Sequence, residues 1–84
     1  MNSKHRKTLE TVFRDPVSAS IEWSDLEALF VACGCRVIEG SGSRVRFEKD
    51  GVLGSFHRPH PAKEAKKYQV RIARAFLIEI GITP

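Results

Sequence analysis

The first stretch of the chain places apolar residues at helical spacing. Leu9, Val12 and Phe13 follow one another at i, i+3 and i+4 behind a polar lead, which predicts a short amphipathic helix over residues 4–13. Residues 15–20 contain a proline and two serines, so we expect a loop there.

A second amphipathic pattern follows this loop. Ser24 and Glu27 have the spacing of a capping box, which predicts that a helix begins at Asp25. Gly34 is expected to end it in the left-handed conformation. Trp23 just before the cap is interpreted as a hydrophobic staple in preference to a base-stacking residue. The predicted apolar stripe consists of Leu26, Leu29, Phe30 and Cys33.

Three short β-rich segments come next. They cover residues 36–39, 44–49 and 52–57, and the loop between the first two is Gly-Ser-Gly-Ser. That loop lacks the lysine of a nucleotide-binding loop, so we interpret it as a turn with a secondary possibility of touching an RNA backbone. The dipeptide Asp50-Gly51 predicts a two-residue type I′ hairpin between the last two strands.

A two-residue hairpin fixes which residues face each other. If Lys49 pairs with Val52, then Arg44 faces His57 and Arg46 faces Ser55. Alternation of side chains then gives the sheet one apolar and one polar face. The predicted core side carries Val45, Phe47 and Phe56, and the other side carries Arg44, Arg46, Ser55 and His57.

The last part of the chain predicts a basic helix. Two prolines in residues 58–61 exclude a continuing central strand, and a helix is expected over residues 65–80 with Gly81 just beyond it. The order is α-α-β-β-β-α, which predicts an α+β fold: a three-stranded antiparallel sheet with helices on one face. The residues expected to be buried on this helix are Tyr68, Ala73, Phe76, Leu77 and Ile80.

Composition narrows the class of protein. With 84 residues, 42% hydrophobic and 29% charged, the chain fits one small domain, residues 1–84. No apolar run is long enough to span a membrane and the N-terminus does not resemble a secretory signal, so we expect a cytoplasmic protein. The net charge of +4 suits a polyanionic partner or an ordinary basic surface. Cys33 and Cys35 are expected to be reduced, partly buried thiols.

The predicted polar face carries candidate chemistry. An imidazole at His57 can transfer protons near neutral pH, and the guanidinium of Arg44 can hold a phosphate. Metal-free RNA cleavage needs these functions, although a basic sheet face with one histidine also fits a passive binding surface or a solvated one. We expect no metal and no cofactor, because no ligand set is visible.

Other basic residues form a second candidate group near the last helix. His60 lies between two prolines and is a secondary candidate for catalysis, although local hydrogen bonding explains it more simply. The start of the helix is either a solvated face or a ridge that contacts phosphates. With the sheet face, the expected RNA-binding set is Ser43, Arg44, Arg46, Lys63, Lys66, Lys67 and Arg71.

The order of these segments resembles the HicA family of toxin ribonucleases. The resemblance rests on LEALFVACGCRVIEGSGSRVRF, FHRPHP and KKYQVRIARAFLIEIGI, within residues 23–82. It implies a fold similar to double-stranded RNA-binding domains, metal-independent cleavage of mRNA, and a HicB-type antitoxin partner. Residues 1–20 then resemble a helical extension of one branch of the family, and residues 21–84 form the HicA-like core. We expect a monomer when free and a hetero-oligomer with the antitoxin.

The chain departs from the family at one position. The usual catalytic histidine follows Gly-Ser at the start of the second strand, and Arg44 stands there in this chain. His57 and His60 are the imidazoles available to replace it. The first hypothesis is therefore an endoribonuclease that uses His57, and the alternative is a non-cleaving RNA-binding or antitoxin-binding module of the same fold.

Overall fold

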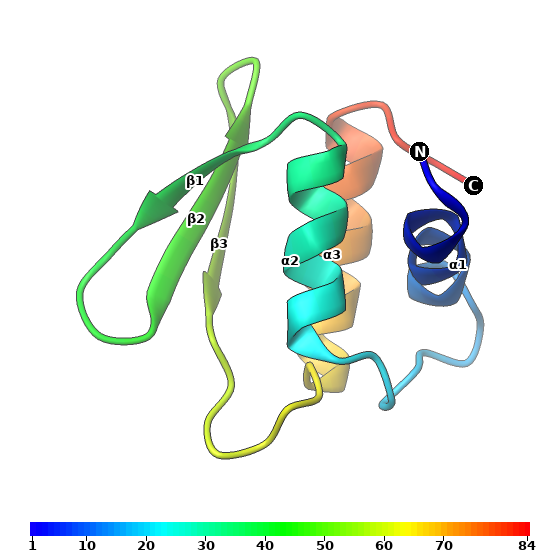
Figure 1. The fold of residues 1–84 in the computed structure, drawn as a ribbon, viewed down its shortest axis with the longest axis horizontal. Helices are drawn as coiled ribbons and strands as arrows, with labels where there is room; N and C mark the ends of the chain where they lie inside the picture. The colour runs from blue at the N-terminus through cyan, green and yellow to red at the C-terminus, as the bar shows by residue number, and fades with distance from the viewer.

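The computed structural model describes residues 1–84, and its elements follow the expected order (Figure 1). The helices are α1 (Ser3–Val12), α2 (Trp23–Ala32) and α3 (Lys67–Glu79), and the strands are β1 (Arg36–Glu39), β2 (Arg44–Lys49) and β3 (Val52–His57). The strands form one antiparallel sheet in the order β1-β2-β3. The predicted α+β class and strand boundaries are confirmed.

The elements form three layers. Figure 1 shows the sheet as one layer, α2 and α3 side by side against one of its faces, and α1 beyond those two helices. The expectation of helices on one face therefore holds, with α1 one layer further from the sheet. Arg74 of α3 joins the outer layers by donating hydrogen bonds to the carbonyl oxygens of Val12 and Arg14, at 3.0 and 2.9 Å. No helix combines the length and the apolar character needed to cross a bilayer.

The hairpin has the predicted register. Lys49 pairs with Val52 and Arg44 pairs with His57. Asp50 and Gly51 both have positive φ, 52° and 84°, as a type I′ turn requires. The Gly51 N–H donates to the Glu48 carboxylate at 2.7 Å, which fixes the turn and lowers the pKa of Glu48.

Aromatic rings connect the sheet to the helices. The ring of Phe30 on α2 lies 4.7 Å from Phe47 and 5.4 Å from Phe76, centroid to centroid. Such tilted and edge-on contacts add to the free energy gained by burying the rings. Cys33 and Cys35 form no disulfide, as expected, and both are buried rather than partly buried. Burial raises the pKa of both thiols.

The start of α2 differs from the prediction. The helix begins at Trp23, two residues before the expected Asp25, and Ser24 lies inside its first turn. Trp23 is 7% exposed with its ring 5.4 Å from that of Phe56, and its backbone N–H donates to the Lys63 carbonyl at 2.8 Å. Tertiary packing therefore places Trp23 in the helix and overrides the local capping signal.

The start and the buried face of α3 also differ. The helix begins at Lys67 rather than residue 65, because the Ala65 N–H is already bonded to the carbonyl of Ile21. Tyr68 was expected to be buried and is 50% exposed. It lies on the opposite side of the helix from Ala73, outside the stripe that faces the core. That stripe consists of Gln69, Val70, Ala73, Phe76 and Leu77.

Candidate functional site

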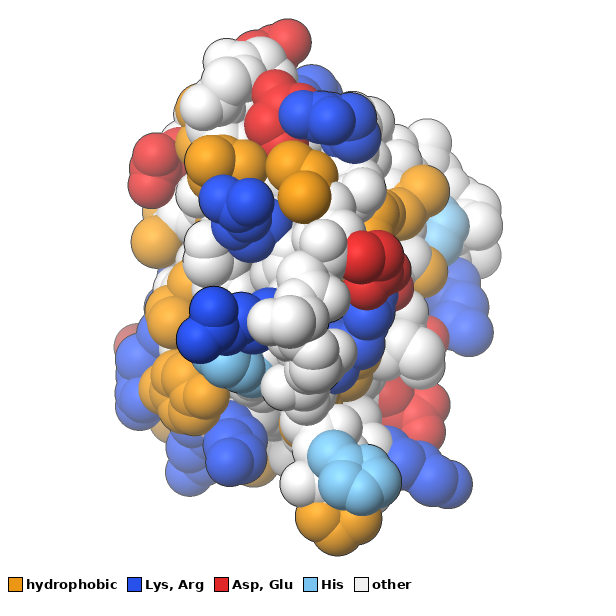
Figure 2. Space-filling view, turned by 90° about the vertical axis from the view of Figure 1, so that its left-hand side faces the viewer, with side chains coloured by type: hydrophobic (Ala, Val, Ile, Leu, Met, Phe, Trp, Pro, Cys, Tyr) orange, Lys and Arg blue, Asp and Glu red, His pale blue; other side chains and the backbone are white.

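The face of the sheet turned away from α2 and α3 is open and cationic. Alternation along β2 and β3 buries one set of side chains and exposes the other. In Figure 2, Lys and Arg side chains are spread over this side of the molecule, with hydrophobic side chains and some Asp and Glu side chains between them. The exposed side chains include Arg44, Arg46, Ser55 and His57, as the register predicted.

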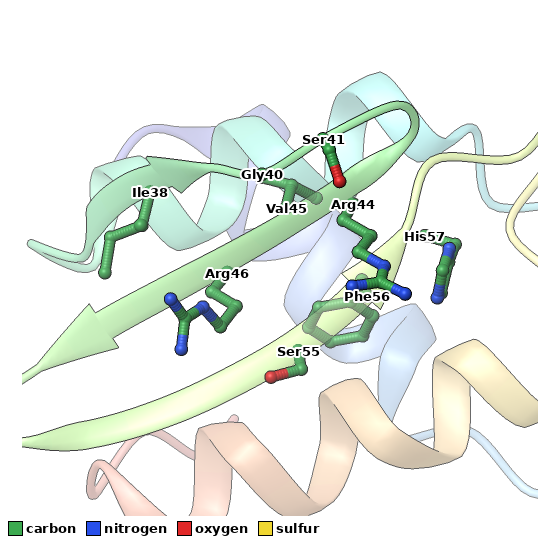
Figure 3. Close-up of a pocket in the computed structure, with 9 residues that line it drawn as sticks. All are labelled: Ile38, Gly40, Ser41, Arg44, Val45, Arg46, Ser55, Phe56 and His57. Atoms are coloured by element: carbon green, nitrogen blue, oxygen red, sulfur yellow. The ribbon is translucent and has the colours of Figure 1, made fainter.

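A hollow of about 580 Å³ lies in this face. Figure 3 shows the guanidinium of Arg44 extending across toward β3 and His57, with Arg46 further along β2. The hollow is bordered by all three strands and by the loop after β1. It is lined by Ile38, Gly40, Ser41, Arg44, Val45, Arg46, Ser55, Phe56 and His57.

Arg44 and His57 form a pair without backbone hydrogen bonds to each other. The backbone N–H of Arg44 donates to the Ser41 carbonyl, and the Arg44 carbonyl accepts from the Gly40 N–H. Both backbone groups of Arg44 therefore point toward the β1 side. The His57 carbonyl accepts from the side chain of Gln69 at 2.7 Å. Pairs of this kind bring the two Cα atoms to about 4.5 Å, closer than hydrogen-bonded pairs. The two side chains therefore leave the sheet next to each other.

A hydroxyl lies next to the imidazole. Ser43 Oγ is 3.4 Å from His57 Nδ1, and the Ser43 carbonyl accepts from the Arg58 N–H at 2.8 Å. Ser43 thus contacts His57, although it does not line the hollow. Its hydroxyl can orient the ring so that Nε2 is available to a substrate.

Gly40 permits the close approach of the loop before Arg44. A Cβ at this position would lie 2.9 Å from the Cβ of Arg44 and 3.2 Å from its carbonyl oxygen. A side chain there would push the loop away from β2. The Gly-Ser segment is a turn, as expected, and part of it forms one wall of the hollow.

The end of β3 is held by a double ion pair. Arg58 donates to the carboxylates of Glu27 and Glu39, with the shortest N···O distances 2.9 and 2.7 Å. The bonds to Glu39 and Glu27 raise the pKa of Arg58, and the bond from Arg58 lowers the pKa of Glu39. Trp23 Nε1 donates to the same Glu27 at 2.7 Å. This network fixes the residue that follows His57 against both α2 and β1.

The remaining predicted residues lie outside the hollow. His60 is exposed in the loop after β3 and does not line it. The basic residues near α3 are also exposed: Lys63 in the loop, Lys66 at the N-cap, and Lys67 and Arg71 on the helix. The structure therefore brings Arg44, Arg46 and His57 together, and leaves the other basic side chains beside α3.

Sequence reasoning missed several residues that shape the site. The wall formed by Ile38 and Ser41 was not predicted. For Ile38 a signal was available, because its pairing with Arg46 places both side chains on the same face of the sheet. The contacts of Gln69 and Arg58 join segments 12 and 31 residues apart and had no local signal. The structure also groups no three His, Cys, Asp or Glu side chains that could hold a metal ion.

The fold and the site define a small α+β protein whose open sheet face presents arginines and an imidazole. The family model described as the HicA toxin of bacterial toxin-antitoxin matches residues 23–82, which is more than half of the chain. The chain belongs to this toxin family. Searches of curated proteins and of solved structures gave no significant match.

Proposed function

We propose that this chain is the toxin of a toxin-antitoxin pair and cleaves mRNA as a metal-independent endoribonuclease. The observation that carries the proposal is the pairing of Arg44 with His57 at the hollow in the open cationic face. Family membership supports the toxin class. The two neighbouring side chains supply a proton acceptor and a cation, which cleavage by attack of the ribose 2′-OH requires.

His57 is the proposed base. It takes the proton from a ribose 2′-OH, and the 2′-oxygen forms a bond to the adjacent phosphorus. Arg44 and Arg46 bind the non-bridging oxygens as negative charge builds on them. The bond from phosphorus to the 5′-oxygen breaks, and that oxygen takes a proton from water or from the imidazolium. The products are a 2′,3′-cyclic phosphate and a 5′-OH.

The position of Arg44 explains how this site can differ from the family pattern. The resemblance puts the usual histidine where Arg44 stands, and the register puts His57 directly across from it. The imidazole thus approaches the same place from the neighbouring strand. His60 remains a second candidate and is weaker, because its side chain does not line the hollow.

RNA is proposed to extend from the hollow toward the start of α3. Ser43, Arg44 and Arg46 would bind the cleaved segment, and the exposed cations Lys63, Lys66, Lys67 and Arg71 would contact flanking phosphates. A HicB-type antitoxin is the proposed protein partner, joining an otherwise monomeric toxin in a hetero-oligomer.

A second candidate function follows from one observation. The second candidate is an RNA-binding or antitoxin-binding module that does not cleave, and the replacement of the family histidine by Arg44 favours it. In that case the Arg44→His variant would create cleavage that the parent lacks. Under the first proposal, the parent cleaves without this change.

Expression in a bacterium tests the proposal. The chain is induced alone and together with the neighbouring open reading frame, and growth and RNA are followed. Growth arrest and RNA loss that the partner relieves are expected. The matched variants are His57→Ala and His5→Ala, which remove one imidazole from β3 or from α1. Arrest without RNA loss would contradict the proposed nuclease. RNA loss unaffected by His57→Ala would contradict the role of His57 as its base.

A further inference from the structure

Gln69 is a polar side chain buried in the core beneath the candidate site. It is 2% exposed and lies in the stripe of α3 that faces the sheet. Both ends of its amide are bonded: Nε2 donates to the carbonyl of His57 at 2.7 Å, and Oε1 accepts from the Lys66 N–H at 2.9 Å. A buried amide is costly unless its groups are paired, so these two bonds define one orientation of the side chain.

The hydrogen bond to His57 takes the place of one that a neighbouring strand would provide. β3 is an edge strand, with β2 as its only neighbour in the sheet. The His57 carbonyl points away from β2, because Arg44 directs its own backbone groups toward β1. Gln69 supplies the donor that a further strand would otherwise provide. The amide therefore fixes the backbone at the last residue of β3, where strands commonly fray.

The other bond fixes the start of α3. The Lys66 N–H precedes the helix and has no intrahelical partner, and Gln69 three residues later caps it. One buried side chain thus connects the backbone of the candidate base with the helix end that carries Lys66 and Lys67. Arg58, the residue after β3, is held separately by its ion pairs with Glu27 and Glu39.

We propose that Gln69 is a positioning residue that holds His57 beside Arg44 for proton transfer. The proposal rests on the proposed nuclease function. Loss of the amide frees the carbonyl of His57 and lets the end of β3 move away from the hollow. Since a misplacement of about 1 Å can slow an enzyme about 10²-fold, a large effect on turnover is expected without loss of RNA binding.

Two variants separate positioning from folding. Gln69→Met keeps the length and volume of the side chain and removes both bonds, while the milder Gln69→Asn keeps an amide that is one methylene shorter. The control is Val12→Ala, a fully buried residue on α1 in the outer layer. Melting temperatures show how much stability each variant loses. Changes in kcat and KM can then be compared between variants with similar losses of stability.

The first measurement is steady-state cleavage of a labelled RNA. Gln69→Met is expected to lower kcat at least tenfold with KM within twofold of the parent, Gln69→Asn less, and Val12→Ala not at all. The positioning role is overturned if kcat of Gln69→Met stays within twofold of the parent, or falls no more than that of Val12→Ala. A rise in KM alone would assign the residue to RNA binding and would also overturn it.

The second measurement does not depend on cleavage. NMR signals of the His57 ring are recorded in the parent and the variants, and those of His5 serve as the internal reference. Broadened or shifted His57 signals in Gln69→Met, with unchanged His5 signals, are expected. Unchanged His57 signals overturn the positioning role. A parent that never cleaves RNA contradicts the nuclease proposal instead, while these spectra still test whether Gln69 positions the ring.

Discussion

Arg44 on β2 and His57 on β3 lie directly opposite each other at the open end of the hairpin. Their backbones are bonded elsewhere, to the loop after β1 and to Gln69 respectively. The pair therefore belongs to the closely spaced class, and its side chains share one face of the sheet. This places a cation next to an imidazole in a hollow that opens to solvent.

Replacing His57 by Ala should abolish most cleavage and leave RNA binding nearly intact. Removal of one proton-transfer group typically slows a reaction about 10²- to 10⁴-fold. Single-turnover cleavage and binding of a non-cleavable RNA measure the two effects separately. His60→Ala should cost much less, because His60 does not line the hollow. A His57→Ala protein that cleaves at the parent rate would remove this residue from the mechanism.

The hairpin was predictable because its determinants are local. Asp50-Gly51 specifies the turn, and the turn sets every facing pair along β2 and β3, including Arg44 with His57. Alternation then assigns the faces of the sheet. Arg44 and His57 could therefore be located from the Asp50-Gly51 turn and the alternation of side chains along the strands.

The support around the pair could not be predicted in the same way. Arg58 reaches Glu27 across 31 positions, and the Gln69 side chain reaches a backbone carbonyl 12 positions earlier. Neither contact leaves a periodic signal in the sequence. The start of α2 was mispredicted for a related reason, since burial of Trp23 depends on strands that come later in the chain.

Cleavage is expected to survive EDTA and to leave a 2′,3′-cyclic phosphate. The proposed chemistry uses an imidazole, two guanidinium groups and the substrate's own 2′-OH, so chelation removes no participant. Product ends are identified by mass spectrometry of a short RNA. An RNA with a 2′-deoxy or 2′-O-methyl group at the cleaved position is the control and should remain intact. Activity that EDTA abolishes and a divalent ion restores would overturn this mechanism.

RNA affinity should fall steeply with salt, partly through the cations beside α3. Each phosphate contact contributes about 0.7 to 0.9 to the slope of log K against log salt. Changing Lys63, Lys66 and Lys67 together to Gln should flatten that slope by about 2 to 3 if each contacts a phosphate. The charge-matched control changes Lys4, Arg6 and Lys7 on α1. Equal effects of the two triple variants would indicate nonspecific attraction rather than a binding ridge.

The ion pairs of Arg58 should make stability fall in acid. The hydrogen bonds from Arg58 lower the pKa of Glu39 below its ordinary value of 4.5. A carboxylate with a lowered folded-state pKa stabilises the fold above its unfolded-state pKa, and this contribution disappears as pH falls through the folded-state value. Glu39 is exposed enough for water to screen the pair, so the predicted observable is the shape of the pH curve rather than a large energy.

Glu39→Gln tests this acid dependence directly. Melting temperatures are measured from pH 3 to pH 7, and the variant should lose less stability on acidification than the parent, because its amide does not titrate. Glu79→Gln at the end of α3 removes a carboxylate that has no ion pair to Arg58, and its curve should follow the parent. If Glu39→Gln and the parent lose stability in parallel below pH 4.5, the Arg58 pair contributes nothing to the acid transition. The end of β3 beside His57 would then be held by Gln69 and the sheet without measurable help from Glu39.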